Sequence, residues 1–417
     1  MSRKELKDMK HTGLFRRTPP VAVETGRLAD FAYLEPGAVY LDSACQSLRP
    51  QPVLDALTEY YTEYNACGGR VKYAWGTRVD REVQDARRAV LELLGLSGRG
   101  HAVSFTLNTT FGLNLLLHQL PQGRFGQMVT SHIEHNSVFL PTMTAATRLG
   151  VPRLVLDRAP DGALVYRPAQ LERAIVVVNV ASNIDGRLLT NLTDLVRDTH
   201  ARGGIVILDA AQAMAHERTL LAKTEADALC FSAHKMYGAS LGVVVATHEL
   251  LSSLELTFVG GGMVADVRED SYDLLANDPG ALLEPGLQAW GEIIALRRAI
   301  EWLGQVRPGG RPAAEHLQGL SQRLFEGLGD IPGLTLVNTA ASPVISAYAP
   351  KQDSHRLAVF LSHSHIMVRS GYFCAHHYLK DQLGLPPLLR FSLGLHSTTA
   401  DVDQAAQALA RLMKGLS

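Results

Sequence analysis

Between residues 101 and 247 the sequence alternates between short apolar runs and amphipathic runs, and this alternation constrains the fold more than any other feature. The apolar runs are rich in Val, Ile and Leu, as expected of strands that are buried on both faces. The runs between them have the apolar spacing of helices. This order is typical of a mostly parallel sheet covered by helices on both sides, so we predict an α/β fold. The predicted strands are residues 101–106, 127–133, 151–156, 174–181, 204–209, 228–232 and 242–247.

Polar side chains follow several of the predicted strands at the point where each strand ends. His135, Asn183, Asp209 and Lys235 stand in such positions. In an open α/β sheet, ligands bind beyond the carboxyl ends of the strands, so we expect these side chains to share one site. An acidic residue and a lysine are the pair that pyridoxal phosphate (PLP) enzymes require, the lysine for a Schiff base and the acid for the ring nitrogen. A surface lysine after a buried strand would give the same local pattern.

A phosphate site is expected at the start of the helix that follows residue 107. Asn108, Thr109 and Thr110 can cap this helix and place hydroxyl groups beside its free backbone N–H groups. A helix start with such groups binds phosphate readily. An ordinary helix cap is the alternative interpretation of the same three residues.

Composition and charge narrow the class of protein. The 417 residues are enough for two or three domains. The 40 Lys and Arg residues nearly balance the 41 Asp and Glu residues, so no net field attracts nucleic acid or an anionic membrane. The charged start does not resemble a signal peptide, and no apolar run is long enough to span a bilayer. The four cysteines are scattered, so we expect a reduced, cytoplasmic protein without a disulfide framework or a zinc ribbon.

The rest of the pattern predicts an N-terminal arm, a large domain and a small domain. Residues 1–37 are the arm, residues 38–300 the large cofactor-binding domain, and residues 301–417 a smaller α+β domain to which the first part of 38–300 also contributes. A Gly-rich loop is expected at residues 68–76, and a flexible region at 260–286. Further helices are predicted at 53–65, 79–95, 168–173, 192–201, 293–303, 313–328, 354–363 and 401–415, and further strands at 334–338, 344–348, 366–370 and 389–393.

A series of short motifs, spread over most of the chain, resembles a known family. The motifs are YLDSA from Tyr40, NTT from Asn108, IEH from Ile133, SN-x-x-G from Ser182, DAAQA-x-x-H from Asp209, FS-x-HK-x-YG from Phe231, GGG from Gly260, RSG-x-x-CA from Arg369 and LR-x-S from Leu389. No single motif is decisive, but their order is similar to that of the fold-type I, class V aminotransferase superfamily of PLP enzymes. Within it, the chain resembles the group II cysteine desulfurases and selenocysteine lyases. The resemblance implies a large, mostly parallel seven-stranded sheet.

The resemblance implies a role for each residue around the PLP ring. Lys235 would be the Schiff-base lysine and the proton shuttle, and Asp209 would pair with the ring nitrogen. Gln212 would bind the phenolic oxygen, His135 would stack on the ring as a catalytic group, and Asn183 would lie near the ring substituents. The residues implied to hold the phosphate are Thr109, Thr110, Ser232 and His234.

The resemblance also implies a substrate and a nucleophile. Arg390 would hold a substrate carboxylate as a bidentate fork, and Arg369 would bind substrate or brace the loop that follows it. Cys374 would attack the sulfur of L-cysteine, or the selenium of a relative, which gives alanine and an enzyme persulfide. Only a thiolate can do so. The other three cysteines, Cys45, Cys67 and Cys230, lack such a context, and we predict that they are structural.

The chain departs from the family pattern at places that bear on the sulfur chemistry. Tyr372 and Phe373 precede the cysteine where group II desulfurases carry two histidines, and His376 and His377 follow it. Leu287 stands where a threonine usually reaches the phosphate of the neighbouring subunit. A PLP-dependent C–S lyase, epimerase or aminotransferase without a persulfide step therefore remains an alternative.

The resemblance further implies a homodimer and a sulfur-acceptor protein as partners. A small amino acid, L-cysteine or a relative, is the expected substrate. A non-catalytic scaffold of the same fold is a third hypothesis, and the presence of Lys235, Asp209, Gln212 and Arg390 argues against it. The histidines at 363, 365, 376 and 377 have loose spacings and no accompanying carboxylates or thiolates, so we predict no metal site.

Overall fold

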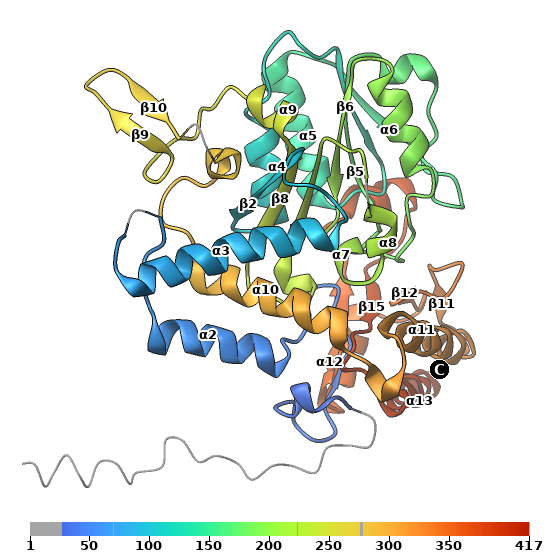
Figure 1. The fold of residues 1–417 in the computed structure, drawn as a ribbon. Coiled ribbons are helices and arrows are strands. Elements are labelled where there is room, and N and C mark those ends of the chain that lie inside the picture. The colour runs from blue at the N-terminus through green and yellow to red at the C-terminus, as the bar shows by residue number, and fades with distance from the viewer. Residues whose placement is uncertain (1–26, 70, 223, 276–277, 417) are drawn as a thin grey trace, which may run out of the picture.

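A seven-stranded sheet forms the centre of the molecule in the computed structural model, which describes residues 27–69, 71–222, 224–275 and 278–416 (Figure 1). The strand order is β2-β8-β7-β6-β5-β3-β4. The strand β8 runs antiparallel to both of its neighbours, and the other neighbouring pairs are parallel. The predicted α/β fold is thus confirmed. The strands are β2 (His101–Thr106), β3 (Gln127–Ser131), β4 (Arg153–Leu156), β5 (Ala174–Asn179), β6 (Ile205–Asp209), β7 (Ala228–Ser232) and β8 (Gly242–Thr247).

Helices cover both faces of this sheet. Successive side chains of its central strands point to opposite sides, so each face presents apolar side chains that the helices bury. In β5, Ile175 and Val177 join the core formed with α4 and α5, whereas Val176 and Val178 join the core formed with α3, α6 and α10. All four side chains are fully buried, which stabilises the fold by roughly 1.5–3 kcal/mol for each residue. The helices around the sheet are α2 (Gln51–Glu63), α3 (Ala74–Leu93), α4 (Thr109–Leu117), α5 (Asn136–Leu149), α6 (Leu192–His200), α7 (Ala213–His216), α8 (Arg218–Leu221), α9 (His248–Ser252) and α10 (Trp290–Gln305).

A second, four-stranded sheet lies in the C-terminal part, in the order β11-β12-β15-β14 with antiparallel neighbours. The N-terminal strand β1 pairs in parallel with β13, and Asp42 forms a bridge with Ser392 of β15. The division into domains stays a prediction, and residue 300 lies inside the continuous helix α10. The elements are β1 (Val39–Tyr40), β11 (Thr335–Leu336), β12 (Val344–Tyr348), β13 (Ile366–Met367), β14 (Arg369–Gly371), β15 (Leu388–Ser392), α11 (Ala313–Gly329), α12 (Ser354–His363) and α13 (Thr399–Leu416).

Part of the predicted N-terminal arm is packed against the molecule. Residues 1–26 lie outside the described residues. Phe31 in the short 3-10 helix Ala29–Phe31 is fully buried, and its ring contacts that of Trp302. Arg27 forms a buried ion pair with Asp401 at 2.9 Å.

Four predicted segments differ from the structure. The predicted loop at 68–76, of which Arg70 lies outside the described residues, includes the first turn of α3. The segment 260–286 contains an antiparallel hairpin, β9 (Val264–Val267) and β10 (Tyr272–Leu274), rather than a wholly irregular region. The predicted strand at 366–370 is divided between β13 and β14, and the predicted helix at 168–173 is a single 3-10 turn. In the part of the chain that is described, no helix is long and apolar enough to cross a bilayer.

Candidate active site

Residues at the carboxyl ends of the central strands line one cavity of about 240 Å³. Asn179 ends β5, Asp209 ends β6 and Ser232 ends β7. This edge of the sheet is where an open α/β fold binds its ligands. The structure brings all the predicted cofactor-binding residues to the cavity wall: Thr109, Thr110, His135, Asn183, Asp209, Gln212, Ser232, His234 and Lys235.

The start of α4 forms one end of the cavity. Asn108 caps the helix, since its side-chain oxygen accepts a hydrogen bond from Phe111 N at 2.9 Å. Thr109 N donates to Ser232 Oγ at 3.0 Å, and the two hydroxyl groups lie 2.7 Å apart. The Thr110 hydroxyl contacts that of Ser137 at 2.6 Å. A cluster of hydroxyl groups at a helix N-terminus is suited to a phosphate.

Asp209 and Lys235 face the same cavity from neighbouring strand ends. Asp209 is 5% exposed, and its Oδ1 accepts a hydrogen bond from Ala211 N at 2.9 Å. Burial raises the pKa of Asp209, although the Ala211 hydrogen bond and Lys235 act against the rise. Burial likewise lowers the pKa of Lys235, and Asp209 opposes that shift. Because a buried carboxylate needs a cationic partner, the arrangement suits a protonated pyridine nitrogen.

His135 is a neutral side chain fixed at the first turn of α5. Its pKa is lowered to about 3, chiefly by burial and to a smaller extent by the nearby Lys235 and Arg390. Its Nδ1 accepts a hydrogen bond from Ser137 N at 3.0 Å, so the ring proton resides on Nε2. The preceding residue, Glu134, is buried and bound by Asn179 N at 2.7 Å, which ties this loop to the end of β5.

His234 is neutral for a similar reason. Burial lowers its pKa to about 4, with further contributions from Lys235 and Arg49. It therefore offers an N–H donor or a ring acceptor at the cavity wall rather than a positive charge.

Several buried polar atoms at the cavity have no hydrogen-bond partner among the described residues. They are Asn183 Oδ1 and both side-chain polar atoms of Asn179. Such atoms are costly unless a ligand or water satisfies them. With the hydroxyl cluster, the buried Asp209 and the lysine, these unsatisfied groups fit a polar ring with a phosphate, as in PLP. Gln212 lies on the same cavity wall, and its side-chain amide donates a hydrogen bond to Ala44 O at 2.8 Å.

Arg390 has partners within the chain on both of its terminal nitrogens. It is 3% exposed, and its Nη2 donates to Asp42 Oδ1 at 3.1 Å. Its Nη1 donates to Asn183 O at 3.1 Å, and the guanidinium lies over the ring of Phe373, 4.7 Å from the centroid. Only Nε lacks a partner among the described residues. An incoming carboxylate must therefore share Arg390 with Asp42.

Arg369 also lies at Asp42, on the more exposed side. Its Nη1 is 3.4 Å from Asp42 Oδ2 and 2.8 Å from Cys45 Sγ, and its side chain is 46% exposed. Two guanidinium groups around one carboxylate leave a net positive charge, which suits a single carboxylate group on a substrate.

Cys374 lies exposed on a strained turn. Phe373 and Cys374 have φ values of 48° and 56°, in the left-handed region that side chains seldom adopt. Two hydrogen bonds hold this turn against the cavity wall, from Asn183 Nδ2 to Phe373 O at 2.8 Å and from Asn136 N to Cys374 O at 2.6 Å. Strain of this kind is characteristic of functional sites.

The histidines after the cysteine brace its segment. His377 contacts His132 at 2.9 Å between ring nitrogens, and its ring stacks on Phe139 with the centroids 4.7 Å apart. The His376 ring packs against Tyr372. Within the described parts of the chain, no group of three or more His, Cys, Asp or Glu side chains is arranged to hold a metal ion.

The sequence assigned no role to Asp42, Ser137 or Asn179, and it assigned Asn108 only the role of a helix cap. Asn108 and Asp42 belong to quoted motifs, and the only available signal was their place beside residues with roles. Ser137 and Asn179 carry no such signal and reach the cavity through the fold alone.

Comparisons with known proteins agree with this geometry. A family model described as aminotransferase class-V matches residues 39–405. A probable cysteine desulfurase of Methanothermobacter thermautotrophicus is 30% identical over 373 residues, which cover 87% of this chain and 89% of that protein. A cysteine desulfurase of Klebsiella pneumoniae is 28% identical over 388 residues, covering 90% and 93%. The apo structure of a cysteine desulfurase from Thermococcus onnurineus NA1 is 27% identical, with a TM-score of 0.82 and coverage of 91% and 95%.

Proposed function

The chain belongs to the class-V aminotransferase family, and from this premise we propose that it removes sulfur from L-cysteine, leaving alanine and a persulfide on Cys374. The single observation that carries the proposal is the exposed Cys374 on a strained turn, which is bonded to the wall of a cavity fitted for PLP. The names of the relatives support the choice of substrate.

PLP is the cofactor, and the cavity residues divide into groups that suit its parts. Lys235 is the amine for its aldehyde, and Asp209 is the acid for its ring nitrogen. The hydroxyl cluster at the start of α4 receives the phosphate. When bound, the cofactor supplies an electron sink that acidifies the α-carbon of an attached amino acid.

Lys235 moves protons in the proposed reaction. Burial lowers its pKa, which favours the neutral amine that can accept the proton of the substrate α-carbon. The same amine can deliver a proton to the β-carbon when sulfur leaves. His135 is neutral and fixed in place, so it can orient the cofactor ring. Because it carries no charge, it does not compete with Asp209 for the cofactor nitrogen.

Arg390 and Arg369 orient the substrate through its carboxylate. The two cations share Asp42, so one additional anion restores the charge balance of the group. Since Arg390 is buried and Arg369 is half exposed, we propose that Arg369 attracts the substrate carboxylate from solvent and that Arg390 then holds it in place.

Cys374 performs the sulfur transfer. Its thiolate attacks the substrate sulfur, a bond forms between the two sulfur atoms, and the bond between the substrate sulfur and its β-carbon breaks. The β-carbon takes a proton, which completes alanine. The exposed position of Cys374 then allows an acceptor protein, unidentified by sequence, to collect the sulfur.

We also propose that two copies associate near the site. Leu107 and Leu287 are 69% and 77% exposed, and Phe258 and Val259 are exposed as well. Leu107 directly precedes Asn108 of the cavity wall, and Phe258 packs on Phe111 of α4. Large apolar side chains left in water beside a functional site are typical of a protein interface.

Steady-state alanine production from L-cysteine, with dithiothreitol to remove sulfur, tests the proposed function. We expect the PLP-loaded protein to form alanine, and Cys374→Ala to lower the rate at least about 100-fold while the colour of bound cofactor persists. Cys67→Ala is the matched control, since Cys67 is exposed but lies away from the cavity, and its rate should equal that of the unaltered protein. Full alanine production by Cys374→Ala would contradict the proposal.

A further inference from the structure

Cys45 lies at the edge of the active site rather than in the core. Its thiol is half-buried, and Arg369 Nη1 donates a hydrogen bond to its Sγ at 2.8 Å. The preceding residue, Ala44, lines a small cavity together with Lys235. A turn fixes the backbone here, since Cys45 N donates to Asp42 O at 3.0 Å. The prediction that Cys45 is merely structural does not account for this position.

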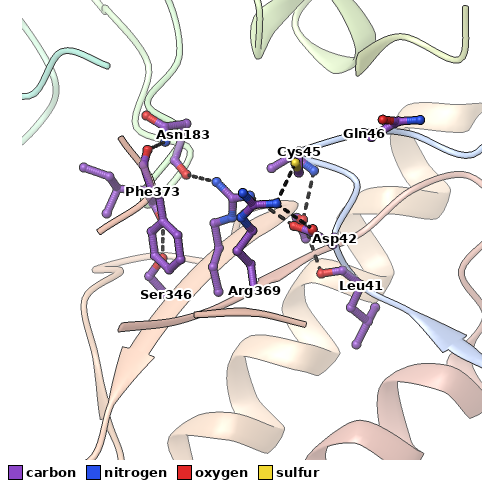
Figure 2. A network of polar contacts seen from close by, with 12 residues as sticks. Leu41, Asp42, Cys45, Gln46, Asn183, Ser346, Arg369 and Phe373 are labelled. Carbon is purple, nitrogen blue, oxygen red and sulfur yellow. Dashed lines mark hydrogen bonds and ion pairs between the residues drawn. The ribbon is translucent and has the colours of Figure 1, made fainter. Parts of the chain in front are cut away.

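A continuous set of polar contacts joins Cys45 to the segment that carries Cys374 (Figure 2). Each contact is a hydrogen bond or an ion pair of between 2.8 and 3.4 Å. The two cysteines therefore belong to one connected network, although they are far apart in the sequence. The contacts run through Cys45, Arg369, Asp42, Arg390, Asn183 and Phe373, which directly precedes Cys374.

Both thiols also act on the same two cations. Burial is the largest influence on the pKa of Lys235 and lowers it, whereas Cys45 and Cys374 are among the groups that oppose this shift. The pKa of Arg369 is raised: burial acts against the rise, and Cys45, Asp42 and Cys374 produce it. Arg369 also stands only five residues before Cys374, on the same segment. Both thiols therefore lie within electrostatic reach of Lys235 and Arg369.

The other two cysteines have different surroundings. Cys230 belongs to strand β7 and is fully buried, and burial raises its pKa well above the usual value, so it is an inert thiol. Cys67 is exposed and lines a separate cavity with Trp290. Cys45 differs from both because the guanidinium of Arg369 donates a hydrogen bond to its sulfur.

We propose that Cys45 is a second sulfur-carrying thiol of the active site, which accepts the sulfane sulfur from the persulfide on Cys374. This proposal rests on the proposed function. The Cys45 thiolate attacks the outer sulfur of the persulfide, and a bond forms between that sulfur and Cys45 Sγ. The sulfur–sulfur bond on Cys374 breaks, and its electron pair leaves with Cys374 Sγ as a thiolate. One persulfide and one thiolate become one persulfide and one thiolate, so no oxidant or reductant is consumed.

The transfer frees Cys374 for the next substrate, while Cys45 in the N-terminal segment holds the sulfur. Arg369 suits this exchange, because its exposed guanidinium lies between the two cysteines in the network and stabilises negative charge on either sulfur.

Mass spectrometry of the PLP-loaded protein tests the relay. The protein is mixed with sulfur-labelled L-cysteine, alkylated after increasing times and digested. We expect the mass of one labelled sulfur first on the Cys374 peptide and later on the Cys45 peptide. Cys45→Ser should retain label on Cys374, and Cys374→Ala should carry none on either peptide. Cys67→Ala should resemble the unaltered protein.

The outcomes separate the relay from the proposed function. Label that stays on Cys374, with alanine formed, overturns the relay and leaves the desulfurase proposal standing. Label on Cys45 in Cys374→Ala overturns the order of transfer. A Cys45–Cys374 disulfide with free sulfide also overturns the relay, because it shows attack on the inner sulfur. Label on neither thiol overturns both proposals.

A measurement without substrate tests whether the thiols can meet. Dibromobimane becomes fluorescent when it bridges two cysteines. We expect fluorescence and a bridged Cys45–Cys374 peptide pair in the PLP-loaded protein and in Cys67→Ala, and loss of both in Cys45→Ser. No bridge in the unaltered protein, with each thiol alkylated separately, would show that the two sulfurs are too far apart for direct transfer.

Discussion

Asp209 and Lys235, an acid and a base, lie at the wall of one cavity, and burial shifts the pKa of each towards its neutral form. It raises the pKa of Asp209 and lowers that of Lys235. A suitable ligand would therefore stabilise each group. A cationic ring nitrogen would pair with the acid, and an electrophilic carbon would bond to the amine. His135 stays neutral beside them, since its pKa is about 3. These three environments explain why the cavity suits PLP better than a simple anion.

Replacement of the lysine should remove cofactor attachment and chemistry together. In Lys235→Ala, we expect the absorbance of covalently held PLP to disappear and alanine production to fall at least about a thousandfold, because no amine remains at this position. Lys351→Ala is the control, since Lys351 is exposed outside the site, and it should retain both signals. An unchanged spectrum in Lys235→Ala would contradict the assignment of this lysine.

His396 makes the stability of the protein sensitive to acid. Burial lowers its pKa to about 4, below the value of about 6.5 expected in the unfolded chain. Between these values the unfolded chain binds a proton that the folded chain does not, so stability is lost as the pH falls from 6.5 towards 4.

His396→Gln tests this linkage, because it keeps a donor for Tyr40 O, which the histidine ring contacts at 2.9 Å. Urea unfolding at pH 7.5 and 4.5 should show that the unaltered protein loses on the order of 2 kcal/mol more stability than the variant. Equal losses in the two proteins would show that His396 titrates normally.

The close approach of β8 to the start of α4 shapes the phosphate end of the cavity. A Cβ atom at Gly242 would overlap Thr106 Oγ1 and the backbone N of Asn108, which caps α4. Only glycine lets the two elements approach this closely. The geometry of the hydroxyl cluster therefore depends on a residue that does not touch the ligand.

Gly242→Ala should displace the first turn of α4 and weaken PLP binding about tenfold or more, which corresponds to about 1.4 kcal/mol. Fluorescence titration of apoprotein with PLP gives the dissociation constant. Gly98→Ala is a suitable comparison, because a Cβ there makes only an ordinary contact, 3.7 Å from Leu91 Cδ1, and its affinity should not change. An unchanged affinity in Gly242→Ala would refute this role.

The elements that the sequence predicts well are those that bury apolar surface on a regular period. The strands β5 and β7 are buried throughout, β8 is buried at all residues but its last, and all three are largely apolar runs. The hairpin of β9 and β10 was not predicted, because its strands are short and mostly exposed and lack an alternating pattern. The strands β13 and β14 looked like one strand, since their separate partners, β1 and β15, are set by distant segments.

The candidate site also has one part that the sequence predicts and another that it does not. The residues around the cavity follow strand ends in local motifs, so sequence could place them together. The pairing of Arg390 with Asp42 joins residues 348 positions apart and depends on the bridge between Asp42 and Ser392. No local sequence pattern predicts such a contact. For the same reason, the position of Cys45 at the site could not be predicted, because its partner Arg369 lies 324 positions away in the sequence.

At the scale of the whole molecule, the proposed association of two copies gives a further prediction. Charged groups in an interface are costly unless paired, so Phe258→Glu with Leu287→Glu should convert a dimer into monomers. Light scattering after size exclusion measures the mass directly. Val165→Glu, an exposed apolar residue after β4, is the control and should remain dimeric. A monomeric unaltered protein would contradict the association.

In the proposed reaction, Cys374 receives the sulfur while the carbon skeleton leaves as alanine. A single turnover tests this directly: PLP-loaded protein receives one equivalent of sulfur-labelled L-cysteine, and both products are counted. We expect one alanine for each labelled sulfur bound to the protein, with Cys374 labelled first. Pyruvate, ammonia and free sulfide in place of alanine, with no sulfur on Cys374, would contradict it and identify a C–S lyase on the same cofactor.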